Sequence, residues 1–120
     1  MHVHLVFVLK YRKKAVTPRV LEALKECFVG VCAKFGATLK ECDGEADHVH
    51  LLVEYLPKMT VAALVNSLKG ASSRVIRKRG FPEVRRVLWG EHFWSPSYFA
   101  ASCGGAPLGI LKEYIRSQRD

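Results

Sequence analysis

A chain of 120 residues, of which 49% are hydrophobic and 10% aromatic, is sufficient for one domain with a continuous core and leaves no room for a second. Its apolar run from Leu5 to Leu9 is far shorter than the roughly 20 residues of a membrane-spanning helix, and no export-signal cleavage site follows it, so we expect a soluble cytoplasmic protein. The 19 lysines and arginines outnumber 11 acidic residues, and the formal charge of +8 favours a polyanionic partner.

The first third of the chain predicts a strand followed by an amphipathic helix. Residues 2–9 are rich in Val, Leu and Phe, as in a β-strand, and a basic loop follows them. Thr17 and Pro18 are typical of a helix start, as N-cap and first helical residue. Apolar residues then recur at three- and four-residue steps until Gly36, which favours a helix end.

Two strands joined by a tight turn are expected next. Residues 37–43 and 47–55 are β-prone, and Asp43-Gly44-Glu45 separates them. We predict a hairpin that turns at this tripeptide, because glycine tolerates a positive φ that other residues resist.

The remaining half predicts a second helix, a fourth strand and a terminal helix. Thr60 is a candidate N-cap and Gly80 a helix end, and the apolar face between them consists of Val61, Leu64, Leu68, Ala71 and Val75. Residues 83–88 have room for one or two helical turns, and residues 93–103 are aromatic and β-prone. Glycines and a proline then break the chain before a final helix within residues 106–119.

The element order β-α-β-β-α-β predicts the fold class. We expect a single α+β domain over residues 1–120, with a ferredoxin-like antiparallel sheet and two helices on one of its faces. The last predicted helix is an addition at the C-terminus.

His48 and His50 form the pattern with the clearest chemical meaning. Strand periodicity places them on the same side, roughly 6–7 Å apart along the strand. Two neutral imidazoles at this spacing can hold a divalent cation if other ligands come from elsewhere in the fold, although two ordinary strand histidines are the alternative. His2 and His4 alternate in the same way, but no acidic residue precedes them as Asp47 precedes His48, so we interpret that pair as structural.

Tyr114 and Gln118 lie one turn apart on the predicted final helix, so they project together. The simpler interpretation is a tyrosine that packs its ring and leaves its hydroxyl in water. Beside a two-histidine metal site, however, the pair would supply a nucleophile and an amide oxygen ligand. A phenol with a pKa of about 10 attacks a phosphodiester poorly unless a cation withdraws charge from the phosphate oxygens.

Two basic segments are candidates for contacts with a nucleic acid backbone, because acidic residues are not interspersed among them as on a plain solubility surface. The candidate contact residues are Lys10, Arg12, Lys13, Lys14, Lys69, Arg74, Arg77, Lys78 and Arg79.

An ordered series of motifs runs through nearly the whole chain. It comprises residues 4–8, Lys10-Tyr11-Arg12, Asp47 to Glu54, Ser67 to Gly70, Leu88 to Gly90, Phe93 to Phe99 and Tyr114 to Gln118. In this series the sequence resembles the TnpA-like single-tyrosine HUH transposases of the insertion sequence 200/605 group. An ordered series of this kind is much more specific than any one motif in it.

The resemblance implies a role for each site residue. His48 and His50 would be the HUH metal ligands, Gln118 would complete the protein's share of the metal sphere, and Tyr114 would attack the DNA. That attack would give a 5′-phosphotyrosine link and a 3′-hydroxyl, which could later rejoin the strands. The family's metal is usually Mg²⁺ or Mn²⁺, although histidine ligands alone would equally suit zinc or nickel. Tyr98, which lies in a matching motif, is the second candidate for the reactive tyrosine.

The resemblance also implies partners. Similar proteins are homodimers in which the last helix crosses to the partner, so Tyr114 would serve the partner's histidines and Gly104-Gly105 would be the hinge. They recognise hairpins in single-stranded DNA, for which the basic segments are the candidate surface. The alternative is a non-catalytic or domesticated module that binds hairpins or repeats, since RNA-recognition domains share the element order. Their aromatic pattern is missing, because the first strand offers Phe7 alone.

Overall fold

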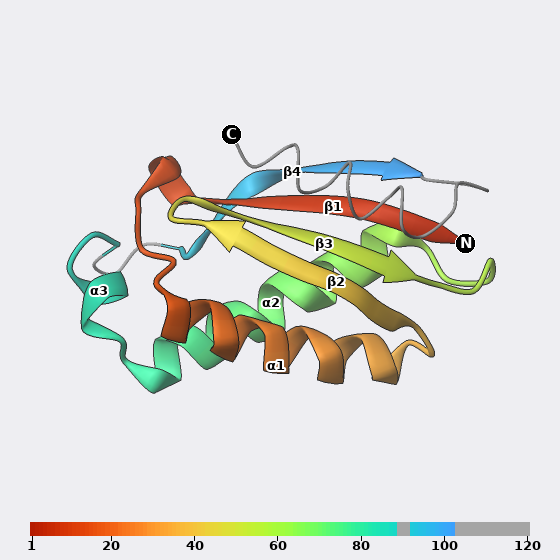
Figure 1. Ribbon diagram of the computed structural model, residues 1–120, viewed down its shortest axis with the longest axis horizontal. Helices are drawn as coiled ribbons and strands as arrows, with labels where there is room; N and C mark the ends of the chain where they lie inside the picture. Colours follow the sequence, from red (N-terminus) through yellow and green to blue (C-terminus); the bar gives the residue numbers. More distant parts are fainter. Residues whose placement is uncertain (89–91, 103–120) are drawn as a thin grey trace.

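The computed structural model describes residues 1–88 and 92–102 (Figure 1). Four antiparallel strands form one sheet in the order β2-β3-β1-β4. The elements in chain order are β1 (His2–Leu9), the short 3-10 helix η1 (Lys10–Arg12), α1 (Pro18–Lys34), β2 (Thr38–Glu45), β3 (His48–Glu54), α2 (Val61–Arg79), α3 (Pro82–Arg85) and β4 (Trp94–Ser102).

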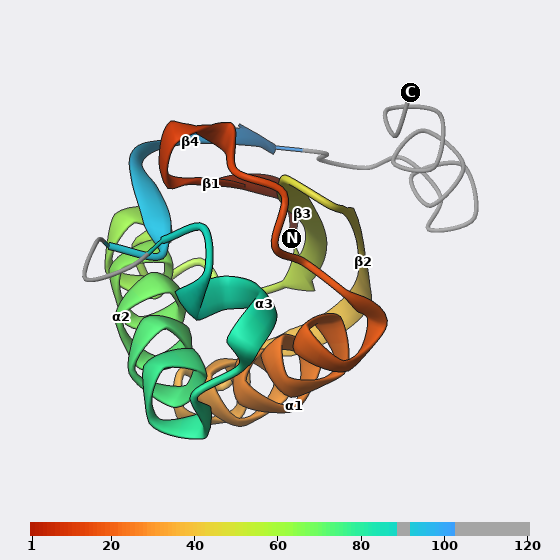
Figure 2. The same cartoon turned by 90° about the vertical axis from the view of Figure 1, so that its left-hand side faces the viewer.

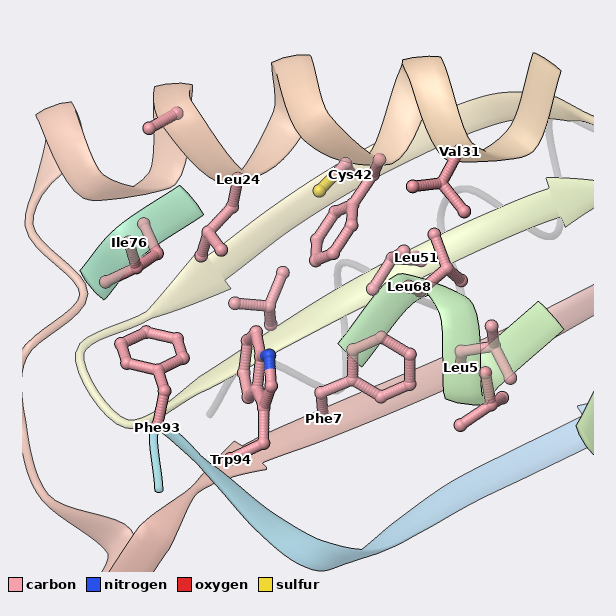
Figure 3. Packing of buried hydrophobic residues seen from close by; sticks show 14 of the residues in the cluster. Leu5, Phe7, Leu24, Val31, Cys42, Leu51, Leu68, Ile76, Phe93 and Trp94 are labelled. Atoms are coloured by element: carbon pink, nitrogen blue, oxygen red, sulfur yellow. The ribbon is translucent and has the colours of Figure 1, made fainter. Parts of the chain in front are cut away.

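Helices α1 and α2 lie side by side on the same face of the sheet, as both views show (Figures 1 and 2). The predicted ferredoxin-like α+β arrangement is therefore confirmed for the described residues. Side chains from the sheet and from both helices meet in the layer between them, among them Leu5, Phe7, Leu24, Leu51 and Leu68 (Figure 3). Burial of this apolar surface is the main stabilising contribution to the fold.

The ends of both long helices follow local signals in the sequence. The Thr17 and Thr60 hydroxyls accept hydrogen bonds from backbone N–H groups in the first turns of α1 and α2, at 3.4 and 3.2 Å. Gly36 and Gly80 have φ values of 71° and 65° beyond the helix ends. Each helix end is therefore stabilised by residues next to it in the sequence. Side-chain oxygens cap the exposed N–H groups, and glycine adopts the left-handed conformation at little cost.

The predicted position of the β2–β3 turn is wrong. β2 continues through Glu45, and the chain reverses at Ala46 and Asp47. Gly44 lies inside the strand opposite Val49, and it is not among the residues with positive φ. A Cβ atom at this position would lie 2.7 Å from the carbonyl oxygen of His48, so glycine is needed for the close approach of two backbones rather than for a turn.

The predicted apolar face of α2 also needs correction. Its buried residues are Leu64, Val65, Leu68, Ser72 and Ile76, whereas Val75 is only half-buried. Ser72 occupies a fully buried position because its hydroxyl donates to the carbonyl of Leu68 at 2.6 Å and accepts the indole N–H of Trp94 at 2.9 Å. A buried polar group that is paired in this way costs little, so a serine can lie in the core.

The predicted C-terminal helix, residues 106–119, lies outside the described residues. Within residues 1–88 and 92–102, no helix combines the length and the apolar composition that crossing a bilayer requires.

Candidate functional site

Both site histidines lie on the face of the sheet that α1 and α2 leave uncovered. Antiparallel pairing of β3 with β1 places His50 opposite Val6 and His48 opposite Val8. The intervening residue Val49 is fully buried, and it belongs to the core on the helix side. Because successive side chains of a strand alternate between faces, the predicted common orientation of His48 and His50 is confirmed.

The two imidazole rings are close enough to share a ligand. Their centroids are 4.8 Å apart and their planes are inclined at 80°. Nδ1 of His48 lies 2.6 Å from a carboxylate oxygen of Asp47, so a proton on Nδ1 is donated to that carboxylate. This tautomer leaves Nε2 of His48 with a lone pair, which is the form a metal ligand requires.

Asp47 is held in its ionised form by its neighbours. The hydrogen bond from His48 is the largest cause that lowers the pKa of this carboxyl, and the Arg12 guanidinium, 3.5 Å away, contributes less. Asp47 is therefore a carboxylate throughout the neutral range, in which it fixes the orientation and the tautomer of the histidine that follows it.

His50 is 2% exposed, and its burial lowers its pKa to about 4, with smaller contributions from His48 and His4. The ring is therefore neutral at physiological pH, because desolvation disfavours the charged imidazolium. Its Nε2 atom is buried and has no hydrogen-bond partner among the described residues. A buried polar atom without a partner is costly, and a bound cation would satisfy it.

His4 is a neighbour of the site that the sequence interpretation missed. It is 1% exposed on β1, and its Nε2 lies 3.3 Å from Nδ1 of His50. Its companion His2 instead lies 3.3 Å from the carboxylate of Glu54. The two histidines of this pair therefore have different surroundings, and only the register between β1 and β3, which the sequence does not state, reveals that one of them touches a candidate ligand.

The donor set fits a divalent cation only in part. His48 and His50 offer two imidazole nitrogens, yet in the part of the chain that the structure describes no three His, Cys, Asp or Glu residues are grouped so that they could hold a metal ion. A complete site therefore needs ligands from beyond these residues or from water. Tyr114 and Gln118, predicted as nucleophile and oxygen ligand, lie outside the described residues.

Tyr98, the second candidate nucleophile, lies on the other side of the sheet. In the pairing of β1 with β4 it is opposite Phe7, whose side chain is in the core between sheet and helices. The Nζ atom of Lys69 on α2 is 5.8 Å from its ring. Phe99, the next residue, packs its ring against His4 on the histidine face. The sheet therefore separates the Tyr98 hydroxyl from His48 and His50.

Most of the predicted DNA-contact residues are exposed and gather at one end of the molecule. The basic loop after β1 and the C-terminal end of α2 both lie at the end of the sheet where β3 begins (Figures 1 and 2). The exposed members are Arg12, Lys13, Lys14, Arg74, Arg77, Lys78 and Arg79, and Lys10 is half-buried. Of these two groups the basic loop lies near His48, which begins β3, because Arg12 is 3.5 Å from Asp47, whereas the end of α2 lies on the helix side of the sheet (Figure 2).

Lys69 differs from the other basic candidates. Its ammonium group donates to the carbonyl oxygens of Ser95 at 2.6 Å and Ser97 at 3.4 Å, and burial lowers its pKa. The side chain joins α2 to β4, so its donors are largely engaged within the protein. A phosphate contact by this residue remains a prediction that the geometry favours less than for its exposed neighbours.

Comparison with known proteins gives a consistent relationship. Residues 1–118 match the family described as "Transposase IS200 like". The ISDra2 transposase TnpA of Deinococcus radiodurans is 32% identical over 117 residues, which cover 98% of this chain and 83% of the relative. The transposase for insertion sequence element IS200 of Salmonella typhimurium is 30% identical over 115 residues, which cover 96% of this chain and 74% of the relative.

Solved structures support the same relationship. The crystal structure of a putative transposase from Deinococcus radiodurans superposes with a TM-score of 0.75 at 28% identity, covering 99% of this chain and 91% of the other. A REP-associated tyrosine transposase bound to a REP hairpin has the same fold, with a TM-score of 0.64 at 10% identity, over 97% of this chain and 61% of the other. The match over residues 1–118 and the relatives at 30% identity or more show that this chain belongs to the IS200-like transposase family.

Proposed function

We propose that this transposase cleaves and rejoins single-stranded DNA, with Tyr114 as nucleophile and a Mg²⁺ or Mn²⁺ ion held by His48, His50 and Gln118. The observation that carries the proposal is the buried Nε2 atom of His50, which has no hydrogen-bond partner within residues 1–88 and 92–102. The ring is 2% exposed and lies beside a second imidazole whose Nδ1 is already tied to Asp47. Two neutral rings with available Nε2 atoms are what a divalent cation needs from histidine ligands.

The chain's own groups account for binding and for proton placement. Asp47 accepts the Nδ1 proton of His48 and so leaves Nε2 of that ring for a cation, while burial lowers the pKa of His50 to about 4 and keeps that ring neutral at physiological pH. The carboxamide oxygen of Gln118 is the proposed third protein ligand. When bound, the cation would withdraw charge from the phosphate oxygens of the DNA and so make the phosphorus atom easier for the tyrosine oxygen to attack.

The covalent step exchanges one phosphate ester for another. The Tyr114 hydroxyl gives its proton to solvent, its oxygen bonds to phosphorus, and the bond from phosphorus to the 3′ oxygen breaks. That oxygen takes up a proton and leaves as the 3′-hydroxyl of the upstream strand, while the downstream strand stays attached to Tyr114 through its 5′ phosphate. Attack by a 3′-hydroxyl on the phosphotyrosine reverses the exchange, restores the tyrosine and joins two strands without an external energy source.

The exposed basic residues suit a single-stranded or hairpin substrate. The loop after β1 carries Arg12, Lys13 and Lys14 next to Asp47 and His48, so a DNA backbone bound there runs close to the histidines. Phosphate contacts of this kind give affinity that falls steeply as salt rises. We therefore place the substrate hairpin at this end of the sheet.

We further propose a cytoplasmic homodimer in which Tyr114 of one subunit acts with the histidines of the other, with Gly104-Gly105 as the connection that permits the exchange. Mixing a His48→Ala variant with a Tyr114→Phe variant tests this directly. Shared sites would restore cleavage in mixed dimers, at one intact site per heterodimer and therefore up to half of the heterodimer fraction. Sites contained within one subunit would leave the mixture as inactive as its two components.

The test of the nucleophile uses two tyrosines of the same chain. Incubation with single-stranded DNA that carries the element's hairpin, in the presence of Mn²⁺, should give a covalent protein–DNA adduct that resists denaturing electrophoresis. Tyr114→Phe should abolish this adduct, and Tyr98→Phe, the matched control on the other side of the sheet, should retain it. An adduct that forms at the normal rate with Tyr114→Phe would reject the assignment.

The binding-module alternative gains little from the structure. RNA-recognition domains stack bases on aromatics of the open sheet face. Here Phe7 is fully buried on the helix side, and the open face carries the exposed Phe99 beside histidines of the neighbouring strands. A module of that kind would bind hairpins without forming any adduct, whether or not Mn²⁺ is added.

A further inference from the structure

We propose that His4 is a positioning residue for the metal ligand His50: it accepts the Nδ1 proton of His50 and thereby keeps Nε2 of that ring deprotonated and aimed at the cation. The inference rests on the proposed metal site and adds to it a residue from a different strand. It assigns a function to His4, the second member of the histidine pair that spacing alone marks as structural.

The two rings meet edge to edge. Nε2 of His4 and Nδ1 of His50 are 3.3 Å apart, the ring planes differ by only 16°, and the centroids are 5.5 Å apart. The centroid separation exceeds the nitrogen separation by about two ring radii, so both nitrogens lie near the line that joins the ring centres. A lone pair of one ring is therefore directed at the other ring's N–H in a nearly common plane, which is the geometry of a hydrogen bond rather than of face-to-face stacking.

Only one of the two possible proton positions is compatible with metal binding. If His4 donated from Nε2, the Nδ1 of His50 would be the acceptor and the proton of His50 would be on Nε2, which could not then bind a cation. If His50 donates from Nδ1, its Nε2 keeps a lone pair, and this is the atom that is buried without a hydrogen-bond partner among the described residues. The contact with His4 therefore selects the tautomer on which the ligand role depends.

Each candidate ligand has a hydrogen-bond partner at its Nδ1 atom, and the two partners come from different parts of the chain. His48 has the Asp47 carboxylate at 2.6 Å from its Nδ1, and His50 has the His4 imidazole at 3.3 Å from its own. Partners of this kind orient metal-binding histidines in many proteins, although an imidazole is a less common acceptor than a carboxylate or carbonyl. The ring of Phe99 packs edge-on against His4, with centroids 5.8 Å apart, and limits its rotation.

The first experiment measures the tautomer of His50 in the metal-free, full-length protein by long-range ¹H–¹⁵N correlation at pH 8. Wild-type His50 should carry its proton on Nδ1, although a free imidazole prefers the other nitrogen. In His4→Phe, which keeps a ring but removes the acceptor, the proton should move to Nε2. A wild-type His50 protonated on Nε2 would overturn the proposal without reference to any variant.

The second experiment measures Mn²⁺ affinity by calorimetry. Loss of a partner that orients a ligand weakens metal binding by about 10- to 100-fold, which is the reduction expected for His4→Phe. His4→Gln can place an acceptor oxygen close to the position of Nε2 and should recover most of the affinity. His2→Phe, a matched change two residues earlier on the same strand, should bind Mn²⁺ as the wild type does, because His2 is paired with Glu54.

The outcomes separate this inference from the proposed function. Equal Mn²⁺ affinity of His4→Phe and wild type would reject the role of His4 and leave the metal site intact. A wild-type protein that binds no Mn²⁺ would reject the metal site, while the tautomer measurement would still decide whether His4 holds the Nδ1 proton. If His4→Phe fails to fold, the comparison of His4→Gln with His2→Phe and the wild-type tautomer decide the question.

Discussion

Gly44→Ala should destabilise the protein although glycine substitutions in regular structure usually stabilise it. The new Cβ would lie 2.7 Å from the carbonyl oxygen of His48 and 3.3 Å from Cα of Val49, and both are backbone atoms that cannot rotate away. β2 and β3 must therefore separate locally. Overpacking of this kind costs about 1–3 kcal/mol, which for a domain of this size lowers the melting temperature by about 4 °C per kcal/mol.

Gly30→Ala is the matched control for this change. Gly30 lies inside α1, and a Cβ atom there would have nothing within 4 Å. Alanine should therefore raise the stability by about 0.5–1 kcal/mol, because glycine loses more backbone freedom in a helix. Thermal and urea unfolding of both variants provide the comparison.

A second measurement links the Gly44 contact to the site. The displaced carbonyl belongs to His48, so Gly44→Ala should also weaken Mn²⁺ binding, whereas Gly30→Ala should leave the affinity unchanged. If Gly44→Ala melts at or above the wild-type temperature, the close approach of the two strands is not what requires glycine, and the reasoning is refuted.

Three further predictions test other contacts. Ser72→Ala should cost about 1–3 kcal/mol in urea unfolding, because it leaves the buried Trp94 N–H without its acceptor; an unchanged midpoint would show that the indole finds another partner. Asp47→Asn should weaken Mn²⁺ binding by about 10- to 100-fold in calorimetry, and an unaltered affinity would contradict its role. Burial raises the pKa of the buried Cys42 thiol to about 12, so its thiolate is scarce at pH 8 and alkylation should modify the half-buried Cys27 before Cys42; mass mapping that finds Cys42 modified before Cys27 would contradict this order.

The parts of the fold that the sequence predicts correctly depend on local chemistry. Thr17 and Thr60 cap helices through their own hydroxyls, and Gly80 ends α2 through its own backbone freedom. The common face of His48 and His50 follows from the alternation of one strand. Each of these features is decided by residues within a few positions of one another, so a sequence read in order contains the information.

The features that the sequence does not predict depend on pairs of distant residues. His4 and His50 are 46 positions apart in the sequence, and Lys69 and Ser95 are 26 positions apart. The residues next to each partner therefore contain no pattern that predicts the contact. The error at Gly44 has the same origin, because its requirement for glycine comes from the facing strand rather than from a turn. The roles of Tyr114 and Gln118, which lie outside the described residues, remain predictions from helix spacing and family resemblance.

Peptide mapping of the covalent protein–DNA complex tests the central claim most directly. After incubation with hairpin DNA and Mn²⁺, digestion and mass spectrometry should find the nucleotide mass on the peptide that contains Tyr114, and a parallel sample of His48→Ala should contain hairpin-bound protein but no such peptide. Attachment at another residue, or an undiminished yield from His48→Ala, would contradict the account.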